Sequence, residues 1–146
     1  NGNRPLVGLA AVHLAQRALD AAKEYASVRV QFGTPIAGHQ LIQKNLADIE
    51  MAITTSRLLC YYALDQMDRN ERANGTSAMA KRYSTTACEQ AISMAMHIHG
   101  AMGISTELGL EQIYRDARML PIPDATNEIL TLIQGREMTG MEAFRA

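Results

Sequence analysis

A stretch near the end of the chain, residues 97–128, gathers the residue types that binding and catalysis require. Gly100 and Gly103 follow a helical pattern, and glycines let a backbone approach a ligand closely. Further along, two prolines precede Asp124, a carboxylate that is followed by Ala125 and Thr126. A carboxylate in an apolar site acts as a general base when its pKa is raised toward the working pH. On the residues alone, however, Asp124 fits the N-cap of a last helix better than a catalytic role.

Composition and charge exclude several classes of partner. The chain has 146 residues, enough for one domain with a core, and a net charge of −1. No basic patch suits nucleic acid, no polybasic stretch suits a membrane, and the longest apolar run, about residues 6–15, cannot span a bilayer. We therefore predict neither nucleic acid nor a membrane as partner. The lack of an initiator Met indicates a piece of a longer chain.

Cysteine and histidine spacing argues against disulfides and metals. Cys60 and Cys88 lie within helical patterns and are predicted to be buried, small, apolar residues in a reducing compartment. His97 and His99 are two residues apart, so they do not share a helix face, and no further His or Cys accompanies them. We predict no metal site.

The elements that must position the stretch are helices. Apolar residues recur every three or four positions, aromatics make up only 5% of the chain, and nine Met are present. Nearly all sides of the first helix are apolar, which predicts burial against another domain or subunit. The spacing predicts an all-α, up-and-down four-helix bundle with an extra short helix. The first predicted helix follows Asn3 as its N-cap and runs to about residue 28, and the second spans 39–69. The third is capped by Thr76 or Ser77 and ends at Gly100, and the last two span 106–118 and 125–138. Between them we predict a connection at 30–38, a turn at 70–75 that is tightest at Asn74-Gly75, and an extended segment at 119–123.

Three motifs in order carry a resemblance to a known family. Arg29-Val-Gln-Phe32-Gly33, Leu46-Ala-Asp48 and the stretch 97–128 resemble, in order and spacing, the C-terminal helical domain of flavin-dependent acyl-CoA dehydrogenases. The resemblance covers essentially all of residues 1–146. It implies that the N-terminal and middle domains of the family, which hold most of the flavin ring and the acyl pocket, lie outside this chain.

The resemblance implies a catalytic base and substrate contacts. In the family, Arg-Asp-Ala is followed by a glutamate and Gly-Thr, and that glutamate removes the α-proton of an acyl thioester. Here Arg115-Asp116-Ala117 leads to Asp124-Ala125-Thr126, so Asp124 is the candidate base, one methylene shorter. Some members place a glutamate before the arginine of the first helix, where this chain has Asn3. Arg4 and Ala125 are the implied substrate-binding residues, although Arg4 taken alone suits a solvated helix start.

The resemblance also implies contacts with FAD. Arg29 and Phe32 match a segment that reaches across a subunit interface to the FAD pyrophosphate, which an arginine binds through a charge-assisted pair. Gln40 matches a position near the flavin. Three further residues match a turn along the adenosine-pyrophosphate half of FAD, in which His97 replaces Gln and Ala101 replaces Gly: His97, Gly100 and Ala101. Thr126 and Glu128 match positions near the flavin. Without the family, Gly100 is a helix stop and Thr126 bonds its own backbone.

The implied protein is an FAD-dependent oxidoreductase that forms an α,β-unsaturated acyl-CoA and passes electrons to an electron-transfer flavoprotein. The family forms homotetramers, a dimer of dimers, in the cytoplasm of bacteria or the mitochondrial matrix of eukaryotes. We expect this chain alone to be inactive. Three alternatives stay open: a nitroalkane-oxidising flavin oxidase, which uses an aspartate base; a non-catalytic subunit of a heteromeric dehydrogenase; and a helical assembly module without flavin.

Overall fold

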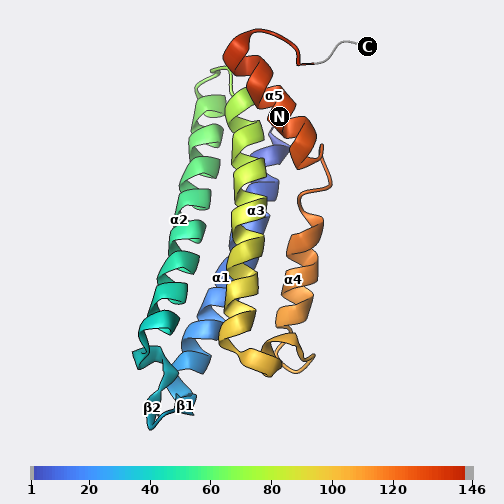
Figure 1. Ribbon diagram of the computed structural model, residues 1–146. Helices are drawn as coiled ribbons and strands as arrows, with labels where there is room; N and C mark the ends of the chain where they lie inside the picture. The colour runs from blue at the N-terminus through green and yellow to red at the C-terminus, as the bar shows by residue number, and fades with distance from the viewer. Residues whose placement is uncertain (1, 144–146) are drawn as a thin grey trace.

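The computed structural model describes residues 2–143, and these residues are almost entirely helical (Figure 1). The all-α prediction is therefore confirmed. The elements, in chain order, are α1 (Asn3–Val28), β1 (Val30–Gln31), β2 (Thr34–Pro35), the 3₁₀ turn η1 (Ile36–Gly38), α2 (Gln40–Asp68), α3 (Asn74–Ile98), the 3₁₀ turn η2 (Gly100–Ile104), α4 (Leu110–Met119) and α5 (Asn127–Thr139).

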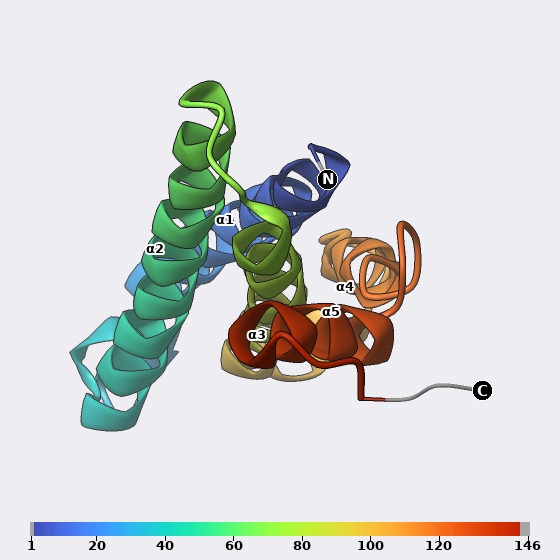
Figure 2. The ribbon, with the colours of Figure 1, turned by 90° about the horizontal axis from the view of Figure 1, so that it is seen from above.

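Helix α3 is the centre of the bundle. It packs against α1, α2, α4 and α5, while α1 also packs against α2 and α4. The three long helices run up and down, and α4 followed by α5 runs back along α3 (Figure 1). Seen along the bundle, α5 turns across α3 instead of continuing the line of α4 (Figure 2). The fourth position of the predicted bundle is thus filled by two short helices, with a loop between them.

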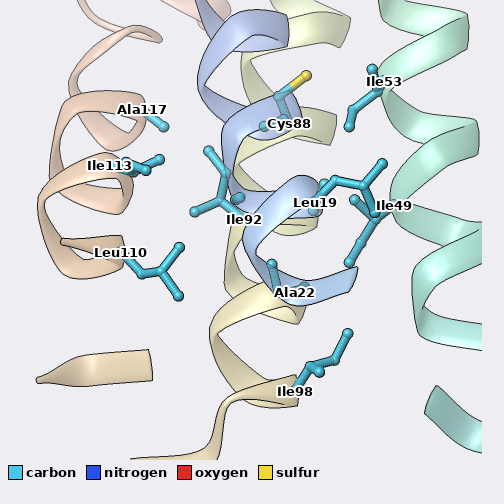
Figure 3. Close-up of a cluster of buried hydrophobic side chains, with 14 of the residues drawn as sticks. Leu19, Ala22, Ile49, Ile53, Cys88, Ile92, Ile98, Leu110, Ile113 and Ala117 are labelled. Carbon is cyan, nitrogen blue, oxygen red and sulfur yellow. The ribbon is translucent and has the colours of Figure 1, made fainter. Parts of the chain in front are cut away.

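Small side chains let the long helices approach closely. The buried face of α1 consists mostly of alanine and glycine, including Gly8, Ala11 and Ala15. On one side of the shared core lie Ile49 and Ile53 of α2, and on the other lie the apolar residues of α4 (Figure 3). Burial of apolar surface contributes about 25 cal/mol per Å². The buried residues of α1 pack against α2, α3 and α4, whereas Leu6 is 54% exposed, so burial of α1 against another domain or subunit stays a prediction.

The two cysteines behave as predicted. Cys60 and Cys88 are free and buried. Burial raises the pKa of both thiols, that of Cys88 to about 11, so neither is a reactive thiolate at neutral pH. No helix within residues 2–143 is both long and apolar enough to cross a bilayer.

The starts of three helices differ from the prediction. Gly2, not Asn3, precedes α1 as its N-cap residue. Helix α3 begins at Asn74, so Gly75 lies inside it, and the tight turn is at Asn70, which has a φ of 58°. Asn70 takes this left-handed conformation at low cost because its short polar side chain can bond locally. Helix α4 begins only at Leu110, because Gly109 adopts a φ of 68° before it.

Two connections also differ. Residues 30–38, predicted as a plain connection, contain an antiparallel hairpin in which Val30 pairs with Pro35 and Gln31 with Thr34. Residues 119–123, predicted as extended, include the last residue of α4 and then turns and bends. Helix α5 begins at Asn127 with Thr126 as its N-cap residue, so the reading of Asp124 as an N-cap is wrong.

Candidate functional site

The residues singled out by sequence fall into two groups at opposite ends of α3. One group, which includes Arg4 and Asp124, lies near Lys81 and the loop between α4 and α5. The other lies around the hairpin and η2, at the opposite end of the bundle (Figure 1). Lys81, which contacts the α4–α5 loop, and His97, beside η2, are 16 positions apart on α3, or about 24 Å at 1.5 Å per residue. The structure therefore assembles two separate sites.

The α4–α5 loop, residues 120–126, carries Asp124 in an unusual backbone conformation. Asp124 has a φ of 54° and Ala125 a φ of 75°, so two consecutive residues with side chains are left-handed. Each such residue costs about 1–2 kcal/mol relative to an ordinary conformation. Asp124 is exposed, and no side chain forms a capping hydrogen bond at the start of α5. Strain of this kind persists only where the surrounding structure fixes it.

A buried lysine of α3, Lys81, forms hydrogen bonds to the backbone of this loop. Lys81 of α3 has a relative exposure of 0%, and its Nζ donates hydrogen bonds to the carbonyl oxygens of Pro121 (3.4 Å), Pro123 (2.5 Å) and Ala125 (2.5 Å). Burial lowers the pKa of Lys81, while the nearby carboxylate of Asp124 raises it and the guanidinium of Arg4 lowers it further. Arg4, Lys81 and Asp124 thus share one end of the bundle.

Arg4 is held by a chain of hydrogen bonds. Its Nη1 donates to Asn74 Oδ1 at 3.0 Å, and Asn74 Nδ2 donates to Glu137 Oε1 at 3.0 Å. Arg72 then donates two bonds to the carboxylate of Glu137, at 2.6 and 2.8 Å. These contacts lower the pKa of Glu137 to about 2, with the bond from Arg72 as the largest cause. The chain ties the starts of α1 and α3 to the last turn of α5.

The start of α5 completes this end. The Thr126 carbonyl accepts the first bond of the helix, from Leu130 N–H at 2.9 Å. Glu128 is exposed in the first turn, where its own N–H and the Thr126 hydroxyl lower its pKa. The carboxylate is therefore ionised at neutral pH. Thr126 and Glu128 flank a cavity of 370 Å³ that also touches α3.

The second site, the hairpin end, is a cavity of 340 Å³ between α1, the hairpin and η2. Its lining includes two predicted FAD residues that bear ring or guanidinium nitrogens, Arg29 and His97, and the backbone of Gly100 and Ala101. Gly100 has a φ of 60°, which favours glycine, and nothing lies within 4 Å of where its Cβ would be. At Gly103 a Cβ would overlap the Met96 carbonyl, so this turn requires glycine.

His99 forms part of the wall of that cavity. The residue is 3% exposed, its Nδ1 lies 2.7 Å from the Ala95 carbonyl oxygen, and its ring centroid is 4.6 Å from that of Tyr25. A carbonyl only accepts, so Nδ1 carries the hydrogen and donates it. Of the two histidines, His99 is therefore a wall residue and His97 an exposed one. Within residues 2–143, no group of three or more metal-ligating side chains is arranged to hold a metal ion.

Phe32 sits at the tip of the hairpin. Its side chain is 96% exposed, and both turn residues have positive φ, 54° for Phe32 and 79° for Gly33, as in a type I′ turn. The rings of Phe32 and His39 are nearly perpendicular, in a T-shaped contact with centroids 6.2 Å apart. Gln40 is exposed in the first turn of α2. An aromatic residue exposed in a strained turn is poorly explained by the fold of this chain alone.

The two ends differ in the polar groups that they expose. Arg29 is exposed and forms none of the ion pairs found among residues 2–143, so its guanidinium is available to a phosphate. The open space at Gly100 admits a ligand against the backbone. At the other end, the exposed carboxylate of Asp124 lies near two cationic side chains, Arg4 and Lys81.

Sequence reasoning missed several residues of these sites. Lys81 carried a usable signal, because it lies in a helical stripe of small residues, between Ser77 and Ser84, where only a buried side chain is expected. Asn74 and Glu137 carried none, because their contacts join residues more than 60 positions apart.

Comparison with known proteins identifies the family. Residues 1–139 match the family model described as "Acyl-CoA dehydrogenase, C-terminal domain". The chain is 37% identical over 138 residues to the probable acyl-CoA dehydrogenase YngJ of Bacillus subtilis, covering 94% of this chain and 36% of that protein. It is 39% identical over 129 residues to the human mitochondrial short-chain specific acyl-CoA dehydrogenase, covering 87% and 31%. The chain belongs to the acyl-CoA dehydrogenase family, and it corresponds to the C-terminal domain.

Solved structures agree with this assignment. Butyryl-CoA dehydrogenase from Megasphaera elsdenii superposes with a TM-score of 0.90 at 32% identity, covering 92% of this chain and 35% of that one. An FAD complex of PigA superposes with a TM-score of 0.84 at 27% identity, covering 88% and 33%. CarC of Acetobacterium woodii, 35% identical over 84% of this chain and 32% of that protein, is named as a subunit of a caffeyl-CoA reductase–Etf complex. The chain thus spans about a third of the length of these relatives.

Proposed function

We propose that this chain is the C-terminal domain of an FAD-dependent acyl-CoA dehydrogenase, with Asp124 as the base that removes the α-proton of an acyl-CoA thioester. One observation supports this proposal: Arg4, Lys81 and the loop that contains Asp124 lie close together at one end of the bundle. A helical assembly module has no need of an exposed carboxylate on a strained turn that a buried cation supports.

In the proposed reaction, the Asp124 carboxylate takes the proton from the α-carbon, and the electron pair of that C–H bond forms the new α,β double bond. The β-hydrogen leaves as a hydride; FAD, when bound, supplies the hydride acceptor. Aspartate is one methylene shorter than the glutamate of the family, so the proposal requires the backbone at Asp124, which has a φ of 54°, to come closer to the substrate. Arg4, half-buried and oriented by Asn74, supplies positive charge beside the base. Ala125 presents only a methyl group on the substrate side.

At the other end, we propose that Arg29, Phe32, Gln40, His97, Gly100 and Ala101 bind the pyrophosphate and adenosine half of FAD. About 24 Å of α3 separates this end from the Asp124 loop, so the two ends serve different FAD molecules. Each flavin then lies between two subunits, which agrees with a strained, fully exposed Phe32. Thr126 and Glu128, beside Asp124, contact the flavin of their own subunit.

We propose a homo-oligomer, organised as a dimer of dimers, as its assembly. The supporting observation is the outer face of α2, which exposes several large apolar residues: Leu41, Met51, Leu58, Tyr61 and Tyr62. A cluster of exposed apolar side chains is typical of an interaction site. An electron-transfer flavoprotein is the proposed electron acceptor, supported by the relative named as part of an Etf complex. The proposed location is the cytoplasm in a bacterium and the mitochondrial matrix in a eukaryote.

The chain spans about a third of the length of its relatives, and we propose that the domains that hold most of the flavin ring and acyl pocket lie outside the 146 residues. We therefore expect this chain alone to lack dehydrogenase activity and to bind FAD weakly. Titration of the chain with FAD, followed by flavin fluorescence, measures this. Tight stoichiometric binding would contradict the expectation.

The decisive test compares Asp124→Asn with wild type in the proposed full-length enzyme, by anaerobic bleaching of the flavin with a panel of acyl-CoAs. We expect wild type to bleach and the variant to retain FAD without bleaching. The matched control is Asp116→Asn, an exposed carboxylate of α4 that accepts a bond from Gln112 at 2.8 Å. Equal bleaching of wild type and Asp124→Asn would place the base elsewhere. If no acyl-CoA bleaches wild type, oxygen uptake with a nitroalkane distinguishes an oxidase from a non-catalytic subunit.

A further inference from the structure

The environment of Lys81 is unusual for a lysine. The whole side chain is buried in a stripe of small residues on α3, and Lys81 forms none of the ion pairs among residues 2–143. Burying a cation is costly unless its donors are satisfied. An ammonium has three donors, and here they meet three backbone carbonyls. All three acceptors belong to the α4–α5 loop, so every hydrogen bond of the Lys81 ammonium goes to this loop.

The spacing of the acceptors determines what the lysine holds. The carbonyls of Pro121, Pro123 and Ala125 alternate along the chain, so the bonds fix the peptide just before Asp124 and the one just after Ala125. The two left-handed residues lie between these fixed points. No other side chain is seen to bond the backbone of residues 120–125 in the described part of the chain. The two prolines, which lack an N–H, cannot donate hydrogen bonds to other partners.

We propose that Lys81 is a positioning residue that clamps the α4–α5 loop in its strained conformation and thereby directs the Asp124 carboxylate outward beside Arg4. The role of the clamp in catalysis rests on the function proposed above; the clamp itself does not. Lys81 is fully buried beneath the loop, so it cannot touch a substrate that approaches from solvent. It acts through the backbone that carries Asp124.

The clamp is tested first without any substrate, by hydrogen exchange in the proposed full-length protein. Lys81→Met keeps an unbranched side chain, one heavy atom shorter, and removes all three donors. We expect exchange at the amides of Ile122 and of residues 124–126 to accelerate at least about tenfold, because the loop opens locally, while exchange in α1 and α2 stays unchanged. The matched control is Arg82→Met, which removes bonds from α3 to Thr131 and Gln134 of α5 but leaves the loop contacts intact.

The catalytic consequence is tested by kinetics. A reacting group displaced by about 1 Å can lose on the order of 100-fold in rate. We therefore expect Lys81→Met to lower kcat on this order, with KM and FAD content within about threefold of wild type, and Arg82→Met to leave kcat nearly unchanged. A general loss of packing would instead lower FAD content and kcat together in both variants.

Adding Ala125→Gly to Lys81→Met gives a rescue test. Glycine adopts a positive φ without a steric penalty, so the loop depends less on the hydrogen bonds from Lys81. We therefore expect the double variant to show slower loop exchange than Lys81→Met alone and a partly recovered kcat. If Lys81→Met fails to fold, recovery of folding by Ala125→Gly supports the clamp, and failure to recover overturns it. Unchanged loop exchange in a folded Lys81→Met also overturns it. Accelerated exchange in a protein that never bleaches with acyl-CoA keeps the clamp and rejects the dehydrogenase.

Discussion

Gly8 shows how a single residue sets the distance between helices. A Cβ at this position would lie 2.6 Å from Cys60 Sγ and 3.3 Å from Ser84 Cβ, so glycine is what lets α1 touch both α2 and α3. We expect Gly8→Ala to lower the free energy of unfolding by about 1–3 kcal/mol through overpacking. The loss from overpacking would outweigh the gain of about 1 kcal/mol that alanine brings in helix propensity. Urea unfolding followed by circular dichroism measures the difference.

Gly135, in the middle of α5, is the matched control for Gly8. Nothing lies within 4 Å of where its Cβ would be. Gly135→Ala should therefore show the propensity effect alone and raise the free energy of unfolding by about 0.5–1 kcal/mol. If the two variants changed stability in the same direction, close packing at Gly8 would not be the cause.

Glu137 links the ends of three helices and gives stability a specific acid dependence. Its pKa is lowered from 4.5 to about 2, chiefly by the bond from Arg72. The unfolded chain therefore binds more protons than the folded chain between these values, so this contribution is complete above pH 4.5 and is lost as pH falls toward 2. We expect Glu137→Gln to unfold at lower urea than wild type at pH 7, with the difference narrowing toward pH 2.

Glu50→Gln, on the exposed surface of α2, is the control for Glu137→Gln. It should leave the urea midpoint close to that of wild type across this pH range. A gap between Glu137→Gln and wild type that stayed constant from pH 7 to pH 2 would contradict the linkage. It would indicate that the carboxylate contributes through packing alone.

At the scale of residues, sequence patterns located the candidate base but not its geometry. The Arg-Asp-Ala motif places Asp124, yet its positive φ depends on Lys81, which is 43 positions away in sequence. Arg4 was identified by family position, and its partner Asn74 was not, because nothing local marks a bond between two helix starts. Contacts of this range are set by packing, which a pattern read along the chain does not encode.

At the scale of elements, the long helices follow directly from apolar periodicity, whereas their ends depend on local backbone chemistry. Helix α2 was predicted within one residue at each end, at 39–69 against Gln40–Asp68. Helix α4 was predicted four residues too early, because Thr106 and Glu107 suit a first turn but Gly109 adopts the left-handed conformation just before the helix. The hairpin was missed because its strands have only two residues each, too short for an alternating pattern.

The hairpin carries a prediction of its own. Asparagine tolerates a positive φ better than phenylalanine does, so Phe32→Asn should stabilise the type I′ turn. If the ring is retained for FAD, the same change should weaken FAD retention in the proposed full-length enzyme by about tenfold, the loss of one aromatic contact of about 1.4 kcal/mol. Gel filtration followed by the flavin-to-protein absorbance ratio measures retention.

A control variant separates the turn from the ring. Phe32→Tyr keeps an aromatic ring in the same strained turn and should retain FAD as wild type does. If Phe32→Asn bound FAD equally well, the exposed ring would have no part in cofactor binding. The hairpin end would then depend on Arg29 and the backbone around Gly100 alone.

At the scale of the whole molecule, the separation of the two ends predicts complementation between subunits. If one flavin uses the Asp124 loop of one subunit and the hairpin of another, two different inactive variants can restore each other. Asp124→Asn removes the base but keeps the hairpin end. Arg29→Glu keeps the base but sets a negative charge against the pyrophosphate. Each variant alone should be inactive in the proposed full-length enzyme.

Co-expression of the two variants gives the measurement. In a mixed pair, the Arg29→Glu subunit supplies an intact Asp124 and the Asp124→Asn subunit supplies an intact hairpin, so one of the two sites is complete. In a two-fold symmetric pair, random pairing makes about half of the pairs mixed. Because only one of the two sites in a mixed pair is complete, activity should recover to about a quarter of that of wild type. Were both ends to serve the flavin of their own subunit, every site would carry a defect and co-expression would restore nothing. The outcome therefore decides whether the 24 Å along α3, about 1.5 Å for each of 16 residues, separates two cofactors or two parts of one site.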